Sequence, residues 1–323
     1  MTQPSSRRRI ALVGVLVIAW VVGSVLGAAP RPRTAAAAPV FQLEPAHASF
    51  VPVLDGSEPI FVLLIGSDAR PGEDVAATRA DSLHILAINA AKAKATIVGI
   101  PRDSYVEIPG RGQDKINAAM FYGGPELVVE TVEELTGITL DYWALTGFKT
   151  FPAMVNGVDG LMVDVPFAMS DDFSEAFFEP GVQRLDGHQA LAFARNRHDL
   201  NAGDFGRSEN QGLLMVSALA QFKREFTKDP GRTLIWVSSF LQHAQTTVAL
   251  DDLMDLVFTA TAISPKRVVN AVFPGSNAMV GTTSVVNLDA AAVQAISRDL
   301  EKDGILKVAN IPPSPNAQQA GEA

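Results

Sequence analysis

The chain contains no cysteine among its 323 residues. This absence excludes disulfide bonds, thiolate metal sites and cysteine nucleophiles, although it leaves the cellular compartment open. Histidine is also scarce, with five in total, and no pair has the spacing of metal ligands. His84 lies in an apolar run and is predicted to be packed rather than catalytic, and we interpret His188 and His198 as ordinary polar positions.

Several motifs of common enzymes are missing as well. There is no G-x-S-x-G elbow, no G-x-x-x-x-G-K-[ST] loop, no G-x-G-x-x-G turn and no H-E-x-x-H helix. Basic residues are outnumbered: residues 1–59 hold five arginines and three acids, which leaves 21 basic and 32 acidic residues, or a net charge of −11, for the rest. We therefore predict no nucleic-acid partner.

One long hydrophobic run is present near the N-terminus. Residues 10–29 carry no charge and follow three arginines at 7–9. Twenty helical residues span about 30 Å, the thickness of a bilayer's hydrocarbon core, and the arginines favour the cytoplasmic side. We predict a transmembrane anchor at 10–29, with 1–9 in the cytoplasm and the later residues outside it. The alternative is a cleaved signal peptide, whose apolar part is usually about 7–15 residues long, with small residues at 34–39 for a peptidase.

The remaining chain divides by composition. Residues 30–55 are rich in proline and alanine, which favours an extended spacer. Residues 309–323 have the composition of a flexible tail. Between them, residues 56–308 alternate short apolar runs with segments of helical period, which predicts an α/β domain whose helices cover a sheet. The predicted strands are 59–66, 82–89, 95–101, 141–147, 160–166 and 268–273, and the main predicted helices are 125–137, 186–195, 206–226, 232–245, 250–263 and 289–302.

Charged residues gather where predicted strands begin or end. Asp68 follows the first strand, and Arg79 and Asp81 precede the second. Arg102 and Asp103 end the third strand. Ligands of α/β sheets bind outside the carboxyl ends of the strands, so these groups are candidates for a common site. A fourth cluster, between two predicted helices, holds three arginines, two acids and an amide: Arg195, Arg197, Arg207, Asp199, Asp204 and Gln211.

These residue types together suit a pyrophosphate. The arginine guanidinium is a planar fork of donors that matches phosphate oxygens and stays charged. Carboxylates can hold Mg²⁺, which usually takes one or two acids and completes its shell with phosphate oxygens and water. Single residues also have plainer interpretations. An isolated arginine forms a surface ion pair, Asp68 and Asp81 stabilise turns, and Asp204 either caps the next helix or acts at the reacting centre.

In this order, the clusters resemble the LytR-CpsA-Psr family of cell-wall glycopolymer ligases. The resemblance covers about residues 60–225 and is carried by "LLIGSDAR", "TRADSLHILAIN", "IPRDSYVEIPGRGQDKINAAMFYGG", "TVEELTGITLDYWALTGF" and "LDGHQALAFARNRHDLNAGDFGRSENQ". It implies a three-layer α/β/α sandwich with a central, mostly mixed sheet. It also implies a deep apolar pocket for a prenyl chain, lined by aliphatic and Phe side chains and opening beside Arg102 and Arg195.

The resemblance also assigns roles. Asp68 and Asp81 resemble the acids associated with Mg²⁺, for which Mn²⁺ is the alternative. Asn210 and Gly212 depart from the family pattern, which has a second basic residue and a second glutamine there. The residues that resemble the pyrophosphate-binding set are Arg79, Arg102, Arg195, Arg197, Arg207, Gln211 and Lys115, of which Arg102, Arg195, Arg197 and Arg207, with Asp204, are the catalytic candidates. Asp103 lies in a matched motif without a definite role.

The implied activity is a phosphotransfer at the cell membrane. The family resemblance implies that a glycan passes from a polyprenyl-pyrophosphate carrier to peptidoglycan and leaves a phosphodiester link. The expected partners are the lipid-linked donor, the peptidoglycan acceptor and membrane lipid. Two alternatives stay open at this point: hydrolysis of the lipid pyrophosphate, and a non-catalytic protein that binds lipid or glycan and regulates.

Overall fold

The computed structural model describes residues 58–69 and 73–321, all within the unit that spans Pro45–Ala323. None of the described helices is both long and apolar enough to cross a membrane. Three predictions fall on residues outside the described ranges: the cytoplasmic segment at 1–9, the anchor at 10–29 and the spacer at 30–55.

A six-stranded sheet forms the centre of the fold. Its strands are β1 (Ile60–Ser67), β2 (Ala80–Asn89), β3 (Lys94–Gly99), β6 (Tyr142–Gly147), β11 (Gln245–Thr246) and β12 (Val268–Val272). They lie in the order β11-β6-β1-β2-β3-β12. β1 runs antiparallel to β2 and parallel to β6, while β3 runs antiparallel to β2 and parallel to β12. The α/β class and the mixed sheet are therefore confirmed.

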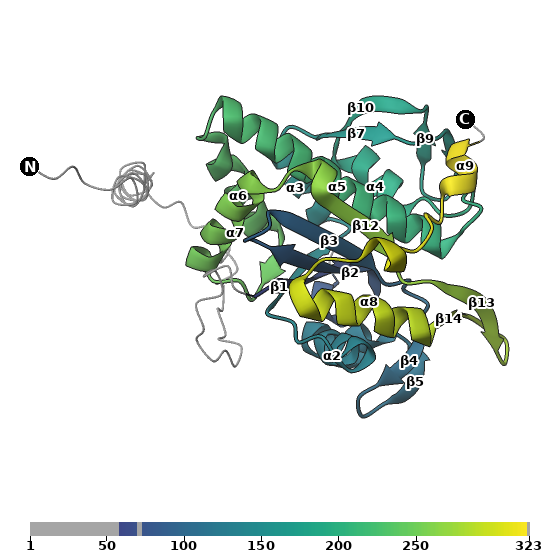
Figure 1. The fold of residues 1–323 in the computed structure, drawn as a ribbon. Coiled ribbons are helices and arrows are strands. Elements are labelled where there is room, and N and C mark those ends of the chain that lie inside the picture. The colour runs from purple at the N-terminus through teal and green to yellow at the C-terminus, as the bar shows by residue number, and fades with distance from the viewer. Residues whose placement is uncertain (1–57, 70–72, 322–323) are drawn as a thin grey trace, which may run out of the picture. The chain divides into compact units, whose positions relative to one another are not determined.

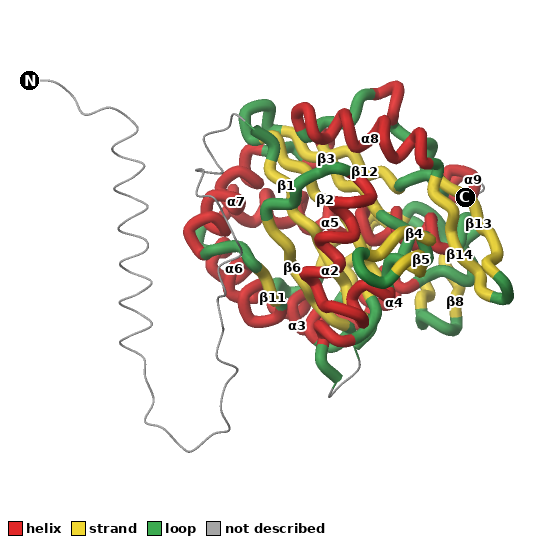
Figure 2. The backbone as a smooth tube through the Cα atoms, turned by 90° about the horizontal axis from the view of Figure 1, so that it is seen from below, coloured by secondary structure: helices red, strands yellow, loops and turns green. Residues whose placement is uncertain are grey.

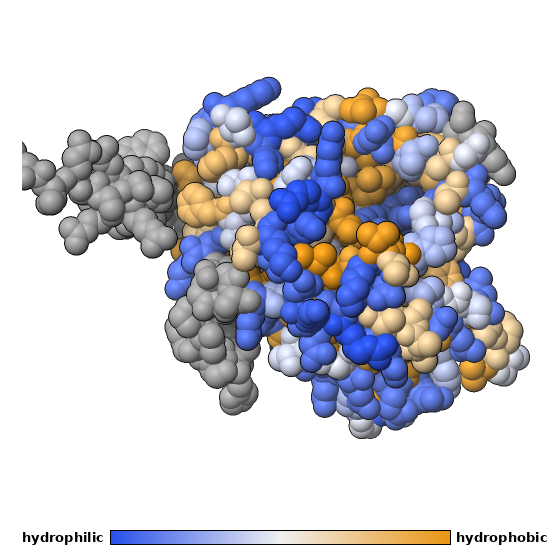
Figure 3. All heavy atoms as spheres, viewed as in Figure 1, coloured by the Kyte–Doolittle hydropathy of each residue, from blue (hydrophilic) through white to orange (hydrophobic). Residues whose placement is uncertain are grey.

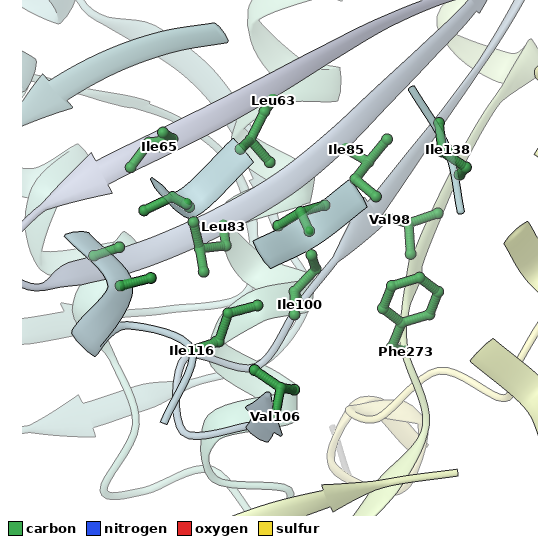
Figure 4. Close-up of a cluster of buried hydrophobic side chains, with 14 of the residues drawn as sticks. Leu63, Ile65, Leu83, Ile85, Val98, Ile100, Val106, Ile116, Ile138 and Phe273 are labelled. Carbon is green, nitrogen blue, oxygen red and sulfur yellow. The ribbon is translucent and has the colours of Figure 1, made fainter. Parts of the chain in front are cut away.

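Alternation of side chains along β1 divides the core into two layers. Leu63 and Ile65 point into one apolar cluster, together with Ile85, which is shown in Figure 4. Ile60 and Val62 point into a second cluster on the opposite face. Successive side chains of a strand face opposite sides of the sheet, so a strand that is apolar at nearly every position is buried on both faces. Each fully buried Leu or Ile contributes about 1.5–3 kcal/mol.

Helices cover both faces of the sheet (Figures 1 and 2). α2 (Ala118–Thr136) and α8 (Ala290–Asp303) contribute to the cluster around Leu63, and the outer surface of α8 is largely hydrophilic (Figure 3). α5 (Asp204–Lys228) packs on β2, β3 and β12 from the other side. That side also carries α3 (Thr150–Gly157), α4 (Gly187–Arg195), α6 (Arg232–His243) and α7 (Leu250–Ala262). The result is the expected three-layer arrangement.

The predicted strands and helices are found close to their expected positions, but five features differ. α2 begins at Ala118 rather than at 125, with non-helical angles at Gly123 and Gly124 that introduce a kink. Three hairpins were not predicted, since their exposed residues lack a clear apolar alternation: β4 (Tyr105–Ile108) with β5 (Gly112–Lys115), β8 (Met169–Asp171) with β9 (Ala176–Phe178), and β13 (Gly275–Val280) with β14 (Thr283–Leu288). The strand β10 (Gly181–Leu185), which pairs with β7 (Leu161–Val165), was also missed.

The segment predicted as a flexible tail has defined contacts with the domain. It contains a short 3-10 turn (Val308–Asn310) and the helix α9 (Ala317–Gly321). The Asn316 amide is buried and donates to the Gly206 carbonyl at 3.0 Å and to the Asn210 side chain at 3.1 Å. Gln319 donates to the Asp199 carbonyl at 3.0 Å. Among the described residues up to Gly321, polar side chains rather than an apolar pattern therefore hold this segment on the domain.

Candidate active site

A chain of alternating charges lies at the start of α5. The Arg102 guanidinium pairs with the Asp81 carboxylate, and its Nε lies 3.8 Å from Asp204 Oδ1. The same Asp204 oxygen accepts a hydrogen bond from Arg207. Because Asp81 is on β2, Arg102 follows β3 and the other two open α5, the fold brings together groups that are far apart in the sequence. The arrangement is a pair of arginines bridged by a carboxylate.

Burial shifts the pKa values of the charged groups in this cluster. Asp204 and Arg207 are each 5% exposed, and burial lowers the pKa of Arg207 even though Asp204 opposes this effect. Burial also acts to lower the pKa of Arg102, but the carboxylates of Asp81, Asp204 and Asp103 together outweigh it and the pKa is raised. Asp204 Oδ2 is buried without a hydrogen-bond partner among the described residues. A buried acceptor of this kind is available to a proton or to a ligand donor.

The capping interpretation of Asp204 is wrong. Gly203 is the N-cap of α5, with a φ of 54°, and no side chain caps this helix end. Asp204 is the first helical residue, and its carboxylate instead pairs with Arg207 one turn later. Glycine suits position 203 because the left-handed region is costly for residues with a Cβ. Because the Asp204 carboxylate does not cap the helix, it is available to pair with Arg102 and Arg207.

A large apolar cavity of about 340 Å³ opens beside these charges. Its walls come from the sheet and from α3, α4, α5 and α6, and they include Leu64, Phe148, Phe151, Leu214, Trp236 and Phe240. Polar groups are confined to a few places, including Asp81, Arg195 and Arg207. An apolar pocket of aliphatic and Phe side chains is thus confirmed; of the two arginines expected beside its opening, Arg195 lines it and Arg102 does not. Cavities of this size and lining are typical of small-molecule and cofactor sites.

A second, polar pocket of about 260 Å³ adjoins the apolar cavity. The two share three lining residues, namely Asp81, Arg195 and Arg207. The other residues of the polar pocket are Arg102, Phe173, Ser174, Arg197 and His198. Four arginines therefore surround one pocket at the mouth of an apolar cavity. Such a combination suits an amphiphilic ligand whose anionic group lies at the junction.

The structure brings together most of the predicted site residues, but not all of them. Arg195 is exposed, and its guanidinium carbon lies 4.8 Å from the centroid of the Phe148 ring. This cation–π contact holds the Arg195 side chain where the two pockets meet. Gln211 lines the apolar cavity and donates to the Ala194 carbonyl at 3.0 Å. The Arg79 side chain is exposed and lines neither pocket. Lys115 lines neither pocket and pairs with Asp103 at 3.1 Å.

The two predicted metal ligands lie on neighbouring strand ends. Asp68 follows β1 and accepts from the Arg79 backbone N–H at 2.9 Å through Oδ1, while Asp81 pairs with Arg102 through its own Oδ1. No group of three or more acidic or histidine ligands occurs in the described part of the chain. Two carboxylates fit Mg²⁺ only where phosphate oxygens and water supply the other ligands. The donor set therefore fits a metal that arrives with a phosphate substrate.

Three site residues were missed by the sequence interpretation. Asp171 is 2% exposed and accepts the backbone N–H groups of Arg197 and His198 at 3.2 Å each. Burial alone would raise the pKa of Asp171, but these hydrogen bonds and that of Phe173 outweigh burial and lower it. Phe173 and His198 line the polar pocket, so the interpretation of His198 as an ordinary polar position is corrected. Neither periodicity nor charge spacing marks these residues, because Asp171 acts through main-chain groups.

The departures at Asn210 and Gly212 also have a structural explanation. A Cβ at Gly212 would lie 1.9 Å from Oδ1 of Asn270 on β12, so a side chain there requires Asn270 to move. Asn210 is buried and accepts from Asn316 of the C-terminal segment. The space that larger side chains would need is taken by two asparagines from distant parts of this chain.

Comparisons with known proteins agree with this geometry. The profile of the LytR_cpsA_psr family matches residues 33–302, and the chain belongs to this family. It is 35% identical over 170 residues to a polyisoprenyl-teichoic acid–peptidoglycan teichoic acid transferase, TagU, of Halalkalibacterium halodurans, covering 52% of this chain and 55% of that protein. Over 256 residues it is 30% identical to TagT of Bacillus subtilis, a transferase of the same name, covering 77% and 78%. The matched region spans about half the length of the TagU proteins.

Solved structures show the same fold. TagV of B. subtilis superposes with a TM-score of 0.66 at 26% identity, covering 79% of this chain and 99% of that one. TagT with bound octaprenyl pyrophosphate lipid superposes with a TM-score of 0.59 at 25% identity, covering 80% and 94%. The mixed α/β sandwich is thus common to this chain and to these structures.

Proposed function

We propose that this protein transfers a glycopolymer from a polyprenyl-pyrophosphate carrier to peptidoglycan and forms a phosphodiester link. The observation that carries the proposal is the junction of the two pockets. An apolar cavity and an arginine-lined pocket share Asp81, Arg195 and Arg207, which matches a ligand with a long apolar chain, a pyrophosphate and a polar head. The names of the related proteins and the lipid bound to TagT support the same substrate class.

The reaction follows from the charges at this junction. A sugar hydroxyl of the acceptor attacks the glycan-side phosphorus, the new P–O bond forms, and the bond to polyprenyl phosphate breaks. Arg195, Arg207 and Arg197 neutralise negative charge on the non-bridging and leaving oxygens, so catalysis is mainly positioning and electrostatics. The hydroxyl proton passes to a carboxylate, for which the unpartnered Asp204 Oδ2 is our candidate.

A divalent cation belongs to the proposal. Asp68 and Asp81 would hold Mg²⁺, or Mn²⁺ in its place, which when bound supplies positive charge to the phosphate oxygens. The Asp81 carboxylate also orients Arg102, so this acid has a role in the chain's own charge network. The exposed Arg79 and the paired Lys115 line neither pocket and are left as outer residues of the donor site.

We further propose a membrane location with the domain outside the cytoplasm. The support is the uncharged run at 10–29 and the arginines before it. A membrane-bound enzyme acts on a lipid donor without extracting the donor fully from the bilayer.

A mass-based assay distinguishes the proposal from its alternatives. The full chain, reconstituted in lipid vesicles, is given a synthetic polyprenyl-pyrophosphate glycan and peptidoglycan fragments. Glycan joined to peptidoglycan through phosphate supports transfer, free phosphorylated glycan indicates a hydrolase, and binding without turnover indicates a regulator. A transfer signal that persists in Arg207→Ala would contradict the site assignment, even with the activity present.

A further inference from the structure

We propose that Phe173 and His198 form a platform that binds a pyranose ring in the polar pocket. The proposal rests on the proposed function, because it assigns the sugar end of that reaction. It concerns the hairpin of β8 and β9 and the loop after α4, neither of which carries a residue predicted to contact sugar. The evidence is the exposure of the Phe173 ring, the hydrogen bonds that fix its position, and its location beside the arginines of the polar pocket.

Phe173 is the most exposed phenylalanine among the described residues. It is 75% exposed, yet its ring stacks on the His198 ring with centroids 4.4 Å apart and an interplanar angle of 36°. A phenylalanine at the surface forgoes the stabilisation of burial. Both rings line the polar pocket. An aromatic face is therefore presented to whatever occupies that pocket.

A single buried carboxylate fixes both rings. Asp171 Oδ1 accepts the Phe173 backbone N–H at 2.9 Å. Asp171 Oδ2 accepts the His198 backbone N–H at 3.2 Å and lies 3.3 Å from His198 Nδ1. The same oxygen accepts the Arg197 backbone N–H. The platform and one of the pocket's arginines thus share one anchor, and preorganised groups lose less entropy when a ligand binds.

The order of groups along the ligand places a sugar at this position. The apolar cavity lies on one side of Asp81, Arg195 and Arg207, and the polar pocket lies on the other. If the prenyl chain fills the cavity and the pyrophosphate meets these arginines, the next group along the donor is a sugar. The attacking hydroxyl of the acceptor must reach the same phosphorus, so its sugar enters the same pocket.

A pyranose ring fits such a surface chemically. One side of many pyranoses presents several C–H groups, which carry slight positive charge, and an aromatic ring presents a negative face. The hydroxyl groups at the ring edge can then be bound by Arg197, while Ser174 lies in the same wall. The shared chemistry is that of a sugar ring, and its source is either the first sugar of the donor or the acceptor sugar.

The chain offers a matched control on the same hairpin. Phe177 is 58% exposed and lines neither pocket. Phe177→Ala therefore removes a comparable surface ring without affecting the proposed platform. Phe173→Leu keeps apolar bulk but removes the aromatic face, and Phe173→Trp keeps the face. Melting temperatures of all variants show whether each one folds.

The test compares two lipids and one acceptor with the full chain in detergent micelles. The lipids are a polyprenyl pyrophosphate without sugar and the same lipid with a disaccharide, and the acceptor is a peptidoglycan fragment. We expect Phe173→Ala and Phe173→Leu to weaken binding of the disaccharide lipid, or raise the KM for the acceptor, by about tenfold. The sugar-free lipid should bind unchanged, and Phe173→Trp and Phe177→Ala should resemble the wild type.

The pattern of results identifies the source of the sugar. A change confined to the disaccharide lipid assigns the platform to the donor, and a change confined to the acceptor assigns it to the acceptor. Equal weakening of both lipids would overturn the proposal, because Phe173 would then act only by holding the arginine loop. No change in any arm would also overturn it. Absence of transfer by the wild type would refute the proposed function instead, while the binding arms would still report on the platform.

Discussion

The two pockets differ in how the chain builds them. Regular elements wall the apolar cavity: three strands of the sheet and helices α3, α4, α5 and α6. The polar pocket is instead assembled from a strand residue, a residue after β3, a hairpin turn, the end of α4 with the loop after it, and the first turn of α5. The comparison teaches that the cavity follows from repeating apolar patterns, whereas the pocket depends on a few side-chain to main-chain contacts.

Their roles differ in the same way. Binding in the cavity depends on area removed from water, at about 25 cal/mol per Å² of apolar surface, and so is graded along the chain length of a lipid. Binding in the polar pocket depends on a few charge-assisted hydrogen bonds, each worth about 1.5–3 kcal/mol. Changes to the pocket should therefore have larger effects per residue than changes to the cavity walls.

The largest effect is expected where the pocket is most buried. Arg207→Ala leaves the Asp204 carboxylate without its nearest cation at 5% exposure, and breaking a buried pair in this way costs about 3–5 kcal/mol of stability. Arg207→Ala combined with Asp204→Ala should recover part of that loss. Chemical unfolding of these variants and of Asp204→Ala completes a double-mutant cycle, and strictly additive losses would show that the pair is not coupled.

The next effect concerns the strand beneath α5. His84 is fully buried, its Nε2–H donates to the Ser208 carbonyl at 3.0 Å, and burial lowers its pKa from 6.5 to about 4. The unfolded chain binds a proton between pH 6.5 and 4 where the folded protein does not. Stability is therefore full above pH 6.5 and falls as the pH drops toward 4, by about 3 kcal/mol in total from this group.

Unfolding measured across that pH range checks the prediction for His84. In His84→Gln the fall between pH 6.5 and 4 should be smaller by about the same amount, since no group titrates at this position. An unchanged pH slope in the variant would assign the acid sensitivity to other residues.

A medium effect is expected at the arginine loop. The Arg197 guanidinium forms no ion pair with a described residue, so Arg197→Ala should leave the melting temperature unchanged or slightly raised. Binding of polyprenyl pyrophosphate should weaken by about 1.5–3 kcal/mol, and lysine should restore it only partly because it lacks the bidentate fork. In a double-mutant cycle with Arg102→Ala, strong coupling is the expected result. Small, additive effects on binding would mean that the two arginines do not share an anion.

A smaller effect should come from the cavity wall. Ala218 lines the apolar cavity from α5, and Ala218→Phe fills part of its volume. Affinity for long prenyl pyrophosphates should fall by about 0.8 kcal/mol for each methylene displaced, with little change for a short-chain analogue. Ala220→Phe on the same helix, outside both pocket linings, is the control. Equal loss for short and long chains would argue against a chain in this cavity.

A further effect, on stability and turnover rather than on donor binding, should arise at the C-terminal segment. Asn316→Ala removes buried hydrogen bonds to Gly206 and Asn210, which should lower stability by about 1–3 kcal/mol. Asn316 bonds to the carbonyl of Gly206, the residue before Arg207, so its loss should shift the position of the Arg207 side chain. We therefore expect the turnover rate to fall more than the affinity for the donor. Steady-state kinetics with melting curves check this split. Unchanged melting and unchanged turnover would show that the segment is not coupled to the site.

The difference between the apolar cavity and the polar pocket also explains which parts of the fold and site could be predicted from the sequence. Runs such as "PIFVLLIG" and the periodic helices predicted an α/β domain whose helices cover a sheet, because a strand buried on both faces is apolar at nearly every position. The helical period placed α2 from Pro125 onward, whereas the helix begins at Ala118, before the kink at Gly123 and Gly124.

The polar pocket could be predicted only in part. Its arginines and acids were found because charged residues stand out in an apolar background, and Asp81, Arg102, Arg195, Arg197 and Arg207 do line it. Asp171, Phe173 and His198 were not found, since their roles depend on backbone hydrogen bonds between residues 26 and 27 positions apart. Asn316 was missed for the same reason, at a separation of 110 residues from Gly206.

The most direct test of the account is a structure of the full chain with a polyprenyl pyrophosphate that carries a disaccharide. The account predicts the prenyl chain in the apolar cavity between Phe151 and Trp236, the pyrophosphate at Asp81, Arg195 and Arg207, and the sugar in the polar pocket. A lipid bound elsewhere, or one whose pyrophosphate lies away from these three shared residues, would contradict it.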